Sequence, residues 1–220
     1  MMDKKLESLI QDIYQASNKY LGLDSRLRKK HKEERARLIL TSIDYESFKD
    51  STLSERPDII NYSQDIGCEV TSAIKEYVYR SFTDYDSLRE NLYSNKLDPN
   101  IDYEEFLLSE FSNWTGPIEL MGAYEKKQKN LNKENYQVFS SNRLYIFAWG
   151  SDDKDIELFE EYLKNLEKSD DYLQFDMVYV FNGLYLLSYT LFPLRLEKFL
   201  FKEEEIDGLN RKAFNNIFNC

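Results

Sequence analysis

The chain has 220 residues, of which 42% are hydrophobic and 15% aromatic, and its formal net charge is −11. A chain of this length and composition can bury a sizeable core, so we expect one folded domain over residues 1–220 and not a disordered protein. The acidic charge argues against a broad basic surface for nucleic acid, because such binding depends on neutralising phosphates. Any nucleic-acid contact is then expected to be local.

Cysteine and histidine are rare in this sequence. Cys68, Cys220 and His31 are too few for the usual four-ligand structural zinc site, and nothing in their placement indicates a disulfide framework. The N-terminal segment lacks an uninterrupted apolar region, and no other stretch is long enough to cross a bilayer. The sequence therefore predicts a cytoplasmic protein without membrane contact.

The first half of the chain predicts helices followed by a β-hairpin. Apolar residues at three- and four-residue spacing predict N-terminal helices over about residues 4–38, broken at Gly22, with an apolar continuation at 38–42 that reads as the start of a strand. The β-rich runs 57–62 and 65–71, separated by polar residues, predict a hairpin, and helical character resumes over 72–79.

The second half predicts alternating helices and strands. An acidic, aromatic segment at about 81–116 is interpreted as an insertion, and Pro117 begins a helix that continues to about Leu131. An apolar strand at 143–149 and a helix at 155–166 follow, and strands at 175–181 and 184–189 flank the hairpin turn Asn182-Gly183. The tail after Pro193 is predicted to be helical. This order predicts an α/β fold, a mixed β-sheet flanked by helices in a single domain.

The hairpin brings two carboxylates together. If Ser63-Gln64 is a two-residue turn, Asp58 pairs with Glu69 across the ladder, and directly opposed residues have Cβ atoms about 5 Å apart. Two like charges at this spacing are destabilising unless one is protonated or a cation lies between them. Mg²⁺ or Mn²⁺ suits this place, because hard divalent ions bind through one or two carboxylates together with waters and phosphate oxygens.

Lys127 is the basic residue expected beside this pair. It interrupts an otherwise apolar stripe of Leu120, Tyr124 and Leu131, so the helical spacing directs it inward. There it would position or activate a water molecule. The alternative interpretation, weighed equally, is one exposed lysine among several.

Glu34 is a further candidate metal ligand. It shares a helix face with Leu27, His31 and Leu38, so it is the acidic residue of this helix expected to point at the sheet. The alternative is a helical salt bridge with Lys30 or Arg37. The basic neighbours Arg26, Arg28, Lys29 and Lys30 provide a local site for a phosphate backbone.

Residues 55–60, Glu-Arg-Pro-Asp-Ile-Ile, and 67–73, Gly-Cys-Glu-Val-Thr-Ser-Ala, resemble the PD-(D/E)XK nuclease superfamily. In that family an Asp after a Pro begins one strand, and an acidic residue with a Lys two positions later lies on the next strand. Thr71 stands where the family places this Lys. The resemblance implies a restriction-endonuclease-like fold and a Mg²⁺-dependent nuclease that hydrolyses phosphodiester bonds in nucleic acid, with Asp58 and Glu69 as catalytic and metal-binding residues. Because many relatives work as dimers, it also suggests a homodimer.

Two other functions are compatible with the sequence. Thr71 and the acidic surface suit a catalytically inactive relative that uses the same fold to bind protein or nucleic acid. The net charge and the aromatic insertion suit an intracellular partner or immunity-type protein.

Overall fold

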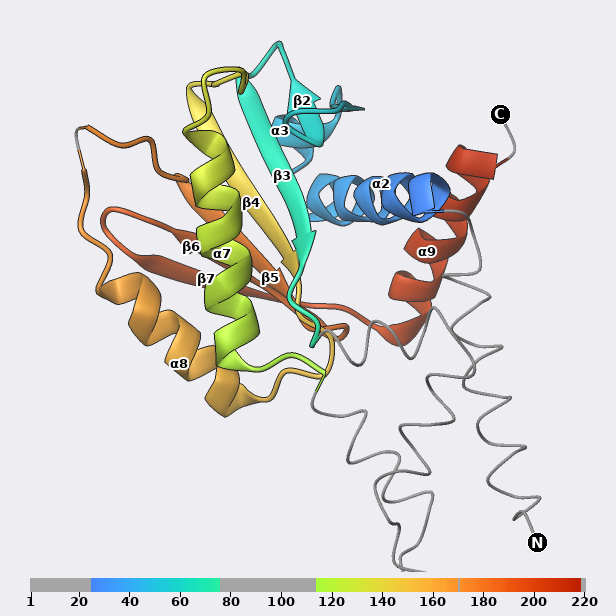
Figure 1. Ribbon diagram of the computed structural model, residues 1–220. Helices are drawn as coiled ribbons and strands as arrows, with labels where there is room; N and C mark the ends of the chain where they lie inside the picture. Colours follow the sequence, from blue (N-terminus) through green and yellow to red (C-terminus); the bar gives the residue numbers. More distant parts are fainter. Residues whose placement is uncertain (1–24, 76–113, 170, 219–220) are drawn as a thin grey trace, which may run out of the picture.

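The computed structural model describes residues 25–75, 114–169 and 171–218 (Figure 1). The predicted helix before Gly22 and nearly all of the predicted insertion at 81–116 lie outside these residues. The described helices are α2 (Ser25–Ile43), α3 (Tyr45–Phe48), α7 (Pro117–Leu131), α8 (Asp153–Lys164) and α9 (Glu203–Phe218). The described strands are β1 (Thr52–Leu53), β2 (Ile59–Asn61), β3 (Ile66–Ser72), β4 (Ser141–Phe147), β5 (Met177–Phe181), β6 (Tyr185–Thr190) and β7 (Arg195–Leu200).

The strands form one seven-stranded mixed sheet in which spatial order follows chain order. β1, β2 and β3 are antiparallel neighbours, β3, β4 and β5 are parallel, and β5, β6 and β7 are again antiparallel. A parallel pair needs a crossover connection, and α7 provides it between β3 and β4, as α8 does between β4 and β5. The predicted α/β class is therefore confirmed.

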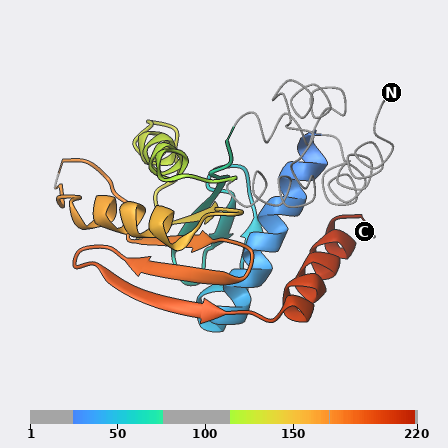
Figure 2. The same cartoon turned by 90° about the horizontal axis from the view of Figure 1, so that it is seen from below.

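Helices cover both faces of the sheet (Figure 2). Alternate residues of each strand point to opposite faces, so Leu144 and Ile146 of β4 join the core under α7 and α8. Tyr145 and Phe147 point to the other face and join the core under α2, α3 and α9. Burial on both faces explains why β4 reads as a nearly continuous apolar run.

Local sequence explains where several elements begin and turn. Pro117 occupies the first turn of α7, where a missing backbone N–H costs no hydrogen bond, and the Glu119 carboxylate accepts from the Gly116 N–H at 3.0 Å. The turn between β5 and β6 is at the predicted Asn182-Gly183. Gly183 has φ 110°, a conformation that favours glycine.

Three predicted elements differ in the structure. Residues 38–42 continue α2 and do not begin a strand, because Leu38, Ile39 and Leu40 are all buried in a helix that packs against both α9 and β3. The sequence predicts a helix at 72–79, of which the structure describes residues 72–75. This part of the prediction is wrong, because Ser72 ends β3 and the next three residues are irregular. The tail contains the predicted helix as α9, but β7 precedes it as an edge strand.

Candidate functional site

The β2–β3 hairpin positions Asp58. Ile60 pairs with Gly67, as the predicted register requires, and Asp58 lies one residue before β2 begins. Its side chain still bonds to β3, because the carboxylate Oδ2 accepts a hydrogen bond from the Val70 N–H at 2.8 Å. Asp58 is only 2% exposed, so this backbone bond holds a buried carboxylate at the point where the two strands separate.

The alternation of β3 positions Glu69. Cys68 and Val70 point into the core under α2, so Glu69 between them points to the opposite face, towards α7. Glu69 is 4% exposed. The strand therefore presents a second buried carboxylate beside Asp58.

Helix α7 delivers a lysine to both carboxylates. Leu120, Tyr124 and Leu131 are buried as predicted, and Lys127 on the same stripe points inward. Its Nζ donates to Asp58 Oδ2 at 3.2 Å and to Glu69 Oε2 in a very short contact. The inward direction predicted for Lys127 is confirmed, and the cation that two close carboxylates require is its ammonium group.

Helix α2 contributes a second ion pair to Asp58. The Lys29 ammonium lies 3.3 Å from Asp58 Oδ1 and 3.3 Å from Glu33 Oε1. Glu33 is buried close to Asp58 and feels its negative charge. Lys29 remains half exposed, so this side of the site is open to solvent.

The surroundings shift the pKa values of Asp58 and Glu69 in opposite directions. Burial opposes ionisation of Asp58, but Lys127, the Val70 N–H and Lys29 outweigh it and hold its pKa below the usual value. Burial raises the pKa of Glu69, because Lys127 only partly compensates and Asp58 repels. Asp58 is therefore the more firmly ionised member of the pair.

The pKa values of the neighbouring ionisable groups are shifted as well. Burial, followed by the charge of Asp58, raises the pKa of Glu33 to about 7. Burial alone would lower the pKa of Lys127, but the charges of Asp58 and Glu69 raise it, so this lysine stays protonated at neutral pH. Lys32, also close to these charges, has a pKa lowered by burial and then by Lys127.

Tyr136 is a member of the site that sequence reasoning missed. It lies in the loop between α7 and β4, and its side chain lies beside the Glu69 carboxylate. Burial and the charge of Glu69 raise the pKa of its hydroxyl, which therefore stays neutral. No periodic pattern marks a single tyrosine in a loop, so the sequence carried no signal for it.

Glu34 does not take the place predicted for it. Its carboxylate accepts from Arg37 Nε at 2.7 Å and from Asn216 Nδ2 of α9 at 2.6 Å, so the alternative helical salt bridge is the one that forms. The face containing Glu34 was correctly identified as buried, but it packs against α9 and not against the sheet, as the contact of His31 with Phe214 shows. The α2 carboxylate at Asp58 is Glu33, about 100° around the helix.

The sequence contains a helical stripe that indicates Glu33. Lys29, Glu33, Ala36 and Leu40 follow one another at four- and three-residue spacing, and the last two are fully buried in the core under α2. The stripe identifies the face of α2 that meets the sheet. Glu33 is the acidic residue on that stripe.

The donor set fits a hard divalent ion with few protein ligands. Among the residues that the structure describes, no group of three His, Cys, Asp or Glu side chains is placed to hold a metal ion. Asp58, just before β2, and Glu69 on β3 supply two carboxylates, which is the number Mg²⁺ commonly takes when water and phosphate oxygens complete its shell. Thr71 lies half-buried two residues along β3 and adds no charge.

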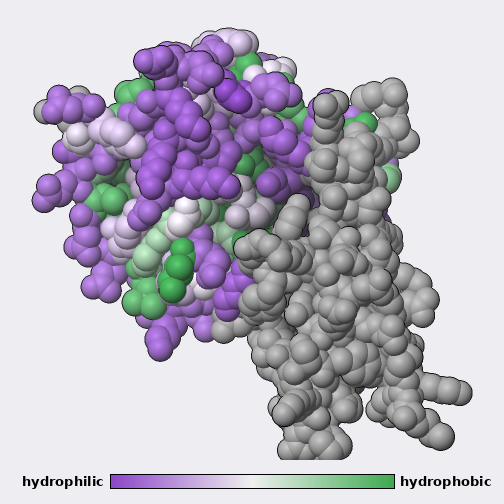
Figure 3. Space-filling view, in the orientation of Figure 1, coloured by the Kyte–Doolittle hydropathy of each residue, from purple (hydrophilic) through white to green (hydrophobic). Residues whose placement is uncertain are grey.

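The surface of the described residues is mostly hydrophilic on the side that Figure 1 shows. The side seen in Figure 3 is mainly hydrophilic, with a smaller hydrophobic area over the lower part of α7 and α8. Within the described part of the chain, no helix is both long and apolar enough to cross a bilayer. Comparison of the chain with protein-family models, curated proteins and solved structures finds no match in any of the three.

Proposed function

We propose that this protein is a metal-dependent nuclease of the PD-(D/E)XK type that hydrolyses phosphodiester bonds. One observation carries the proposal: two buried carboxylates of the β2–β3 hairpin region meet one lysine from a helix distant in sequence. Ion clusters this buried are costly to maintain for stability alone, and perturbed charged groups gather at functional sites. Apart from the short helix α3, the described order α2, β1, β2, β3, α7, β4 resembles the helix, strand and hairpin order of that superfamily.

Lys127 would do the work of the superfamily's lysine, because Thr71 stands at the position where the superfamily has that lysine. Its ammonium reaches both acidic residues, although it comes from α7 and not from β3. Because its pKa is raised, it remains charged and does not act as a base. Its role is to orient a water molecule and to offset negative charge that builds on the phosphate.

Asp58 and Glu69 are the residues that would hold Mg²⁺ or Mn²⁺. Such an ion, when bound, lowers the pKa of a water and neutralises phosphate charge. Val70 keeps Asp58 in place through its N–H, and Tyr136 does so for Glu69. Lys29, half exposed beside Asp58, is placed to meet a neighbouring phosphate of the strand.

Cleavage assays test this function directly. Single- and double-stranded DNA and RNA are incubated with the protein in Mn²⁺ or Mg²⁺. Asp58→Asn and Glu69→Gln are expected to lower cleavage at least about 100-fold, because each removes a charge needed in the transition state. Asp65→Asn is the matched control, since Asp65 is an exposed carboxylate in the turn of the same hairpin. Equal activity of Asp58→Asn and wild type would contradict the proposal.

A second candidate is a catalytically inactive relative that binds through the same fold. The observation in its favour is that Lys127 already satisfies both carboxylates, so the cluster is stable without an added cation. The two candidates differ in metal binding. Only the nuclease requires that Mn²⁺ compete with the ammonium group for Asp58 and Glu69.

A further inference from the structure

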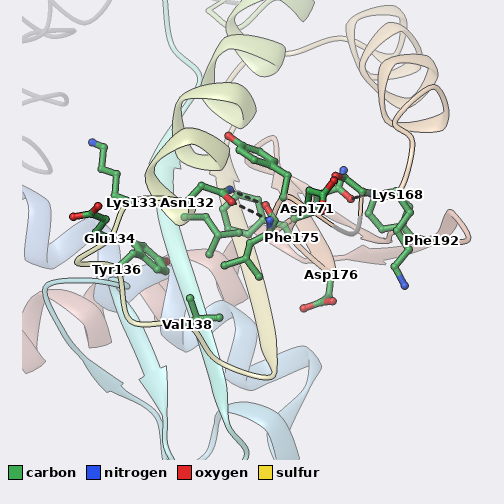
Figure 4. A pocket seen from close by; sticks show the side chains of 15 residues that line it. Asn132, Lys133, Glu134, Tyr136, Val138, Lys168, Asp171, Phe175, Asp176 and Phe192 are labelled. Atoms are coloured by element: carbon green, nitrogen blue, oxygen red, sulfur yellow. Dashed lines mark hydrogen bonds between the residues drawn. The ribbon is translucent and has the colours of Figure 1, made fainter.

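A pocket adjoins the acidic cluster and shares one residue with it. It has a volume of about 550 Å³ and lies between the α7–β4 loop and the α8–β5 loop. Figure 4 shows Tyr136 at one end, next to β3, and Phe192 and Lys168 at the other end. Because Tyr136 also lies beside Glu69, one side chain separates the pocket from the carboxylates.

The rim and walls of the pocket are rich in apolar and aromatic groups. Three exposed hydrophobic side chains gather here: Val138, Tyr172 and Leu173 are 47%, 41% and 44% exposed. The buried Phe175 and half-buried Phe192 extend this lining. Exposed apolar side chains gathered at a cavity make this pocket a candidate ligand site.

The charges of the pocket disfavour a phosphate inside it. Glu134, Asp171 and Asp176 outnumber the lining lysines Lys133 and Lys168. An anion would therefore meet net repulsion, whereas a neutral planar group would not. The phosphate of a bound strand belongs instead beside Lys127 and Lys29.

The polar amides of the pocket already have partners in the chain. Asn132 Oδ1 accepts from the Leu173 N–H at 2.9 Å, and its Nδ2 donates to the Leu173 carbonyl oxygen at 2.8 Å. Gln174 is held in the same way by Ser169 and Glu167. A ligand here is thus recognised by stacking and shape more than by hydrogen-bond readout.

We propose that this pocket holds an unstacked nucleobase of the strand whose phosphate lies at the Asp58, Glu69 and Lys127 cluster. The inference rests on the proposed nuclease function and makes its substrate class specific. A base reaches such a pocket only from a single strand or a frayed end, and stacking on aromatic side chains tolerates any base. The substrate is therefore single-stranded nucleic acid without strong sequence preference.

Binding of two strands that differ only in their bases tests the proposal. Fluorescent oligothymidylate is compared with an abasic deoxyribose-phosphate strand of equal length and charge, in Ca²⁺ to limit cleavage. Wild type is expected to bind oligothymidylate about 10-fold more tightly, the effect of stacking about one base. Tyr172→Ala, which removes an aromatic wall, and Val138→Trp, which fills the pocket, are both expected to abolish this preference.

Controls separate the pocket from the fold and from catalysis. Tyr45→Ala removes a tyrosine of α3 that is 62% exposed and lies outside the pocket, and should keep the preference. If wild type does not discriminate, or if both pocket variants still discriminate, the pocket assignment is overturned even when cleavage is observed. Discrimination that both pocket variants abolish, without any Mn²⁺-dependent cleavage, supports the pocket and overturns only the hydrolytic function.

Discussion

Replacing Lys127 by Met is expected to destabilise the fold strongly, because it leaves two buried carboxylates without their shared cation. Asp58 and Glu69 side chains are 3% and 5% exposed, and Lys127 is 16% exposed. Removing one partner of a buried ion pair typically costs about 3–5 kcal/mol. Lys29 still compensates Asp58, so we expect the lower end of this range, about 3 kcal/mol.

Urea unfolding at neutral pH measures this cost. Lys126→Met is the matched control, since its neighbour Lys126 is exposed on α7, and it should change the free energy of unfolding by less than about 0.5 kcal/mol. The uncompensated charge left by Lys127→Met falls mainly on Glu69, so adding Glu69→Gln should restore much of the lost stability. Mn²⁺ at 100 times its dissociation constant should stabilise Lys127→Met by about 2.7 kcal/mol if it binds where the ammonium lay.

Two results would refute this reasoning. The first is a Lys127→Met variant no less stable than Lys126→Met, which would mean that the ion pairs contribute nothing measurable. The second is a double variant in which Glu69→Gln adds its own destabilisation to that of Lys127→Met. Independent, additive losses would show that Lys127 and Glu69 are not energetically coupled.

Three further predictions concern the surroundings of the site. Tyr136→Phe keeps the ring but removes the hydroxyl that interacts with Glu69, and should weaken Mn²⁺ binding about 10–100-fold by titration calorimetry; unchanged affinity would mean that Tyr136 does not position Glu69. A Cβ at Gly67 would lie 2.5 Å from an aromatic carbon, so Gly67→Ala should cost about 1–3 kcal/mol in urea unfolding, whereas Gly122→Ala, with open space around it, should not destabilise. Burial lowers the pKa of His31, so its protonation opposes folding; the stability of His31→Gln relative to wild type, measured by urea unfolding, should therefore rise as pH drops below about 6.5.

The hairpin could be predicted because the residues that determine it lie close together in the sequence. The alternation of apolar residues and the polar turn define the register that pairs Ile60 with Gly67, and this register alone brings Asp58 next to Glu69. Lys127 was predictable for a related reason. One charged residue on an apolar helical stripe must either be buried or interrupt the packing, and here it is buried against opposite charge.

Features that depend on which surface each helix packs against could not be predicted from the sequence. The stripe of Glu34 is buried, but only the tertiary structure shows that α9 and not the sheet covers it. Strand β7 was missed because it is an exposed edge strand, and five of its six residues are exposed, so it lacks a buried alternation. Tyr136 reaches Glu69 from a loop, where no periodicity constrains a side chain.

The location of Mn²⁺ in crystals of the protein tests the central claim most directly. Anomalous scattering should show one peak between the carboxylates of Asp58 and Glu69, with the Lys127 ammonium moved aside and still close to both. No peak at this place at saturating Mn²⁺, with Lys127 still bridging the two carboxylates, would contradict a metal-dependent nuclease and support the inactive binding protein.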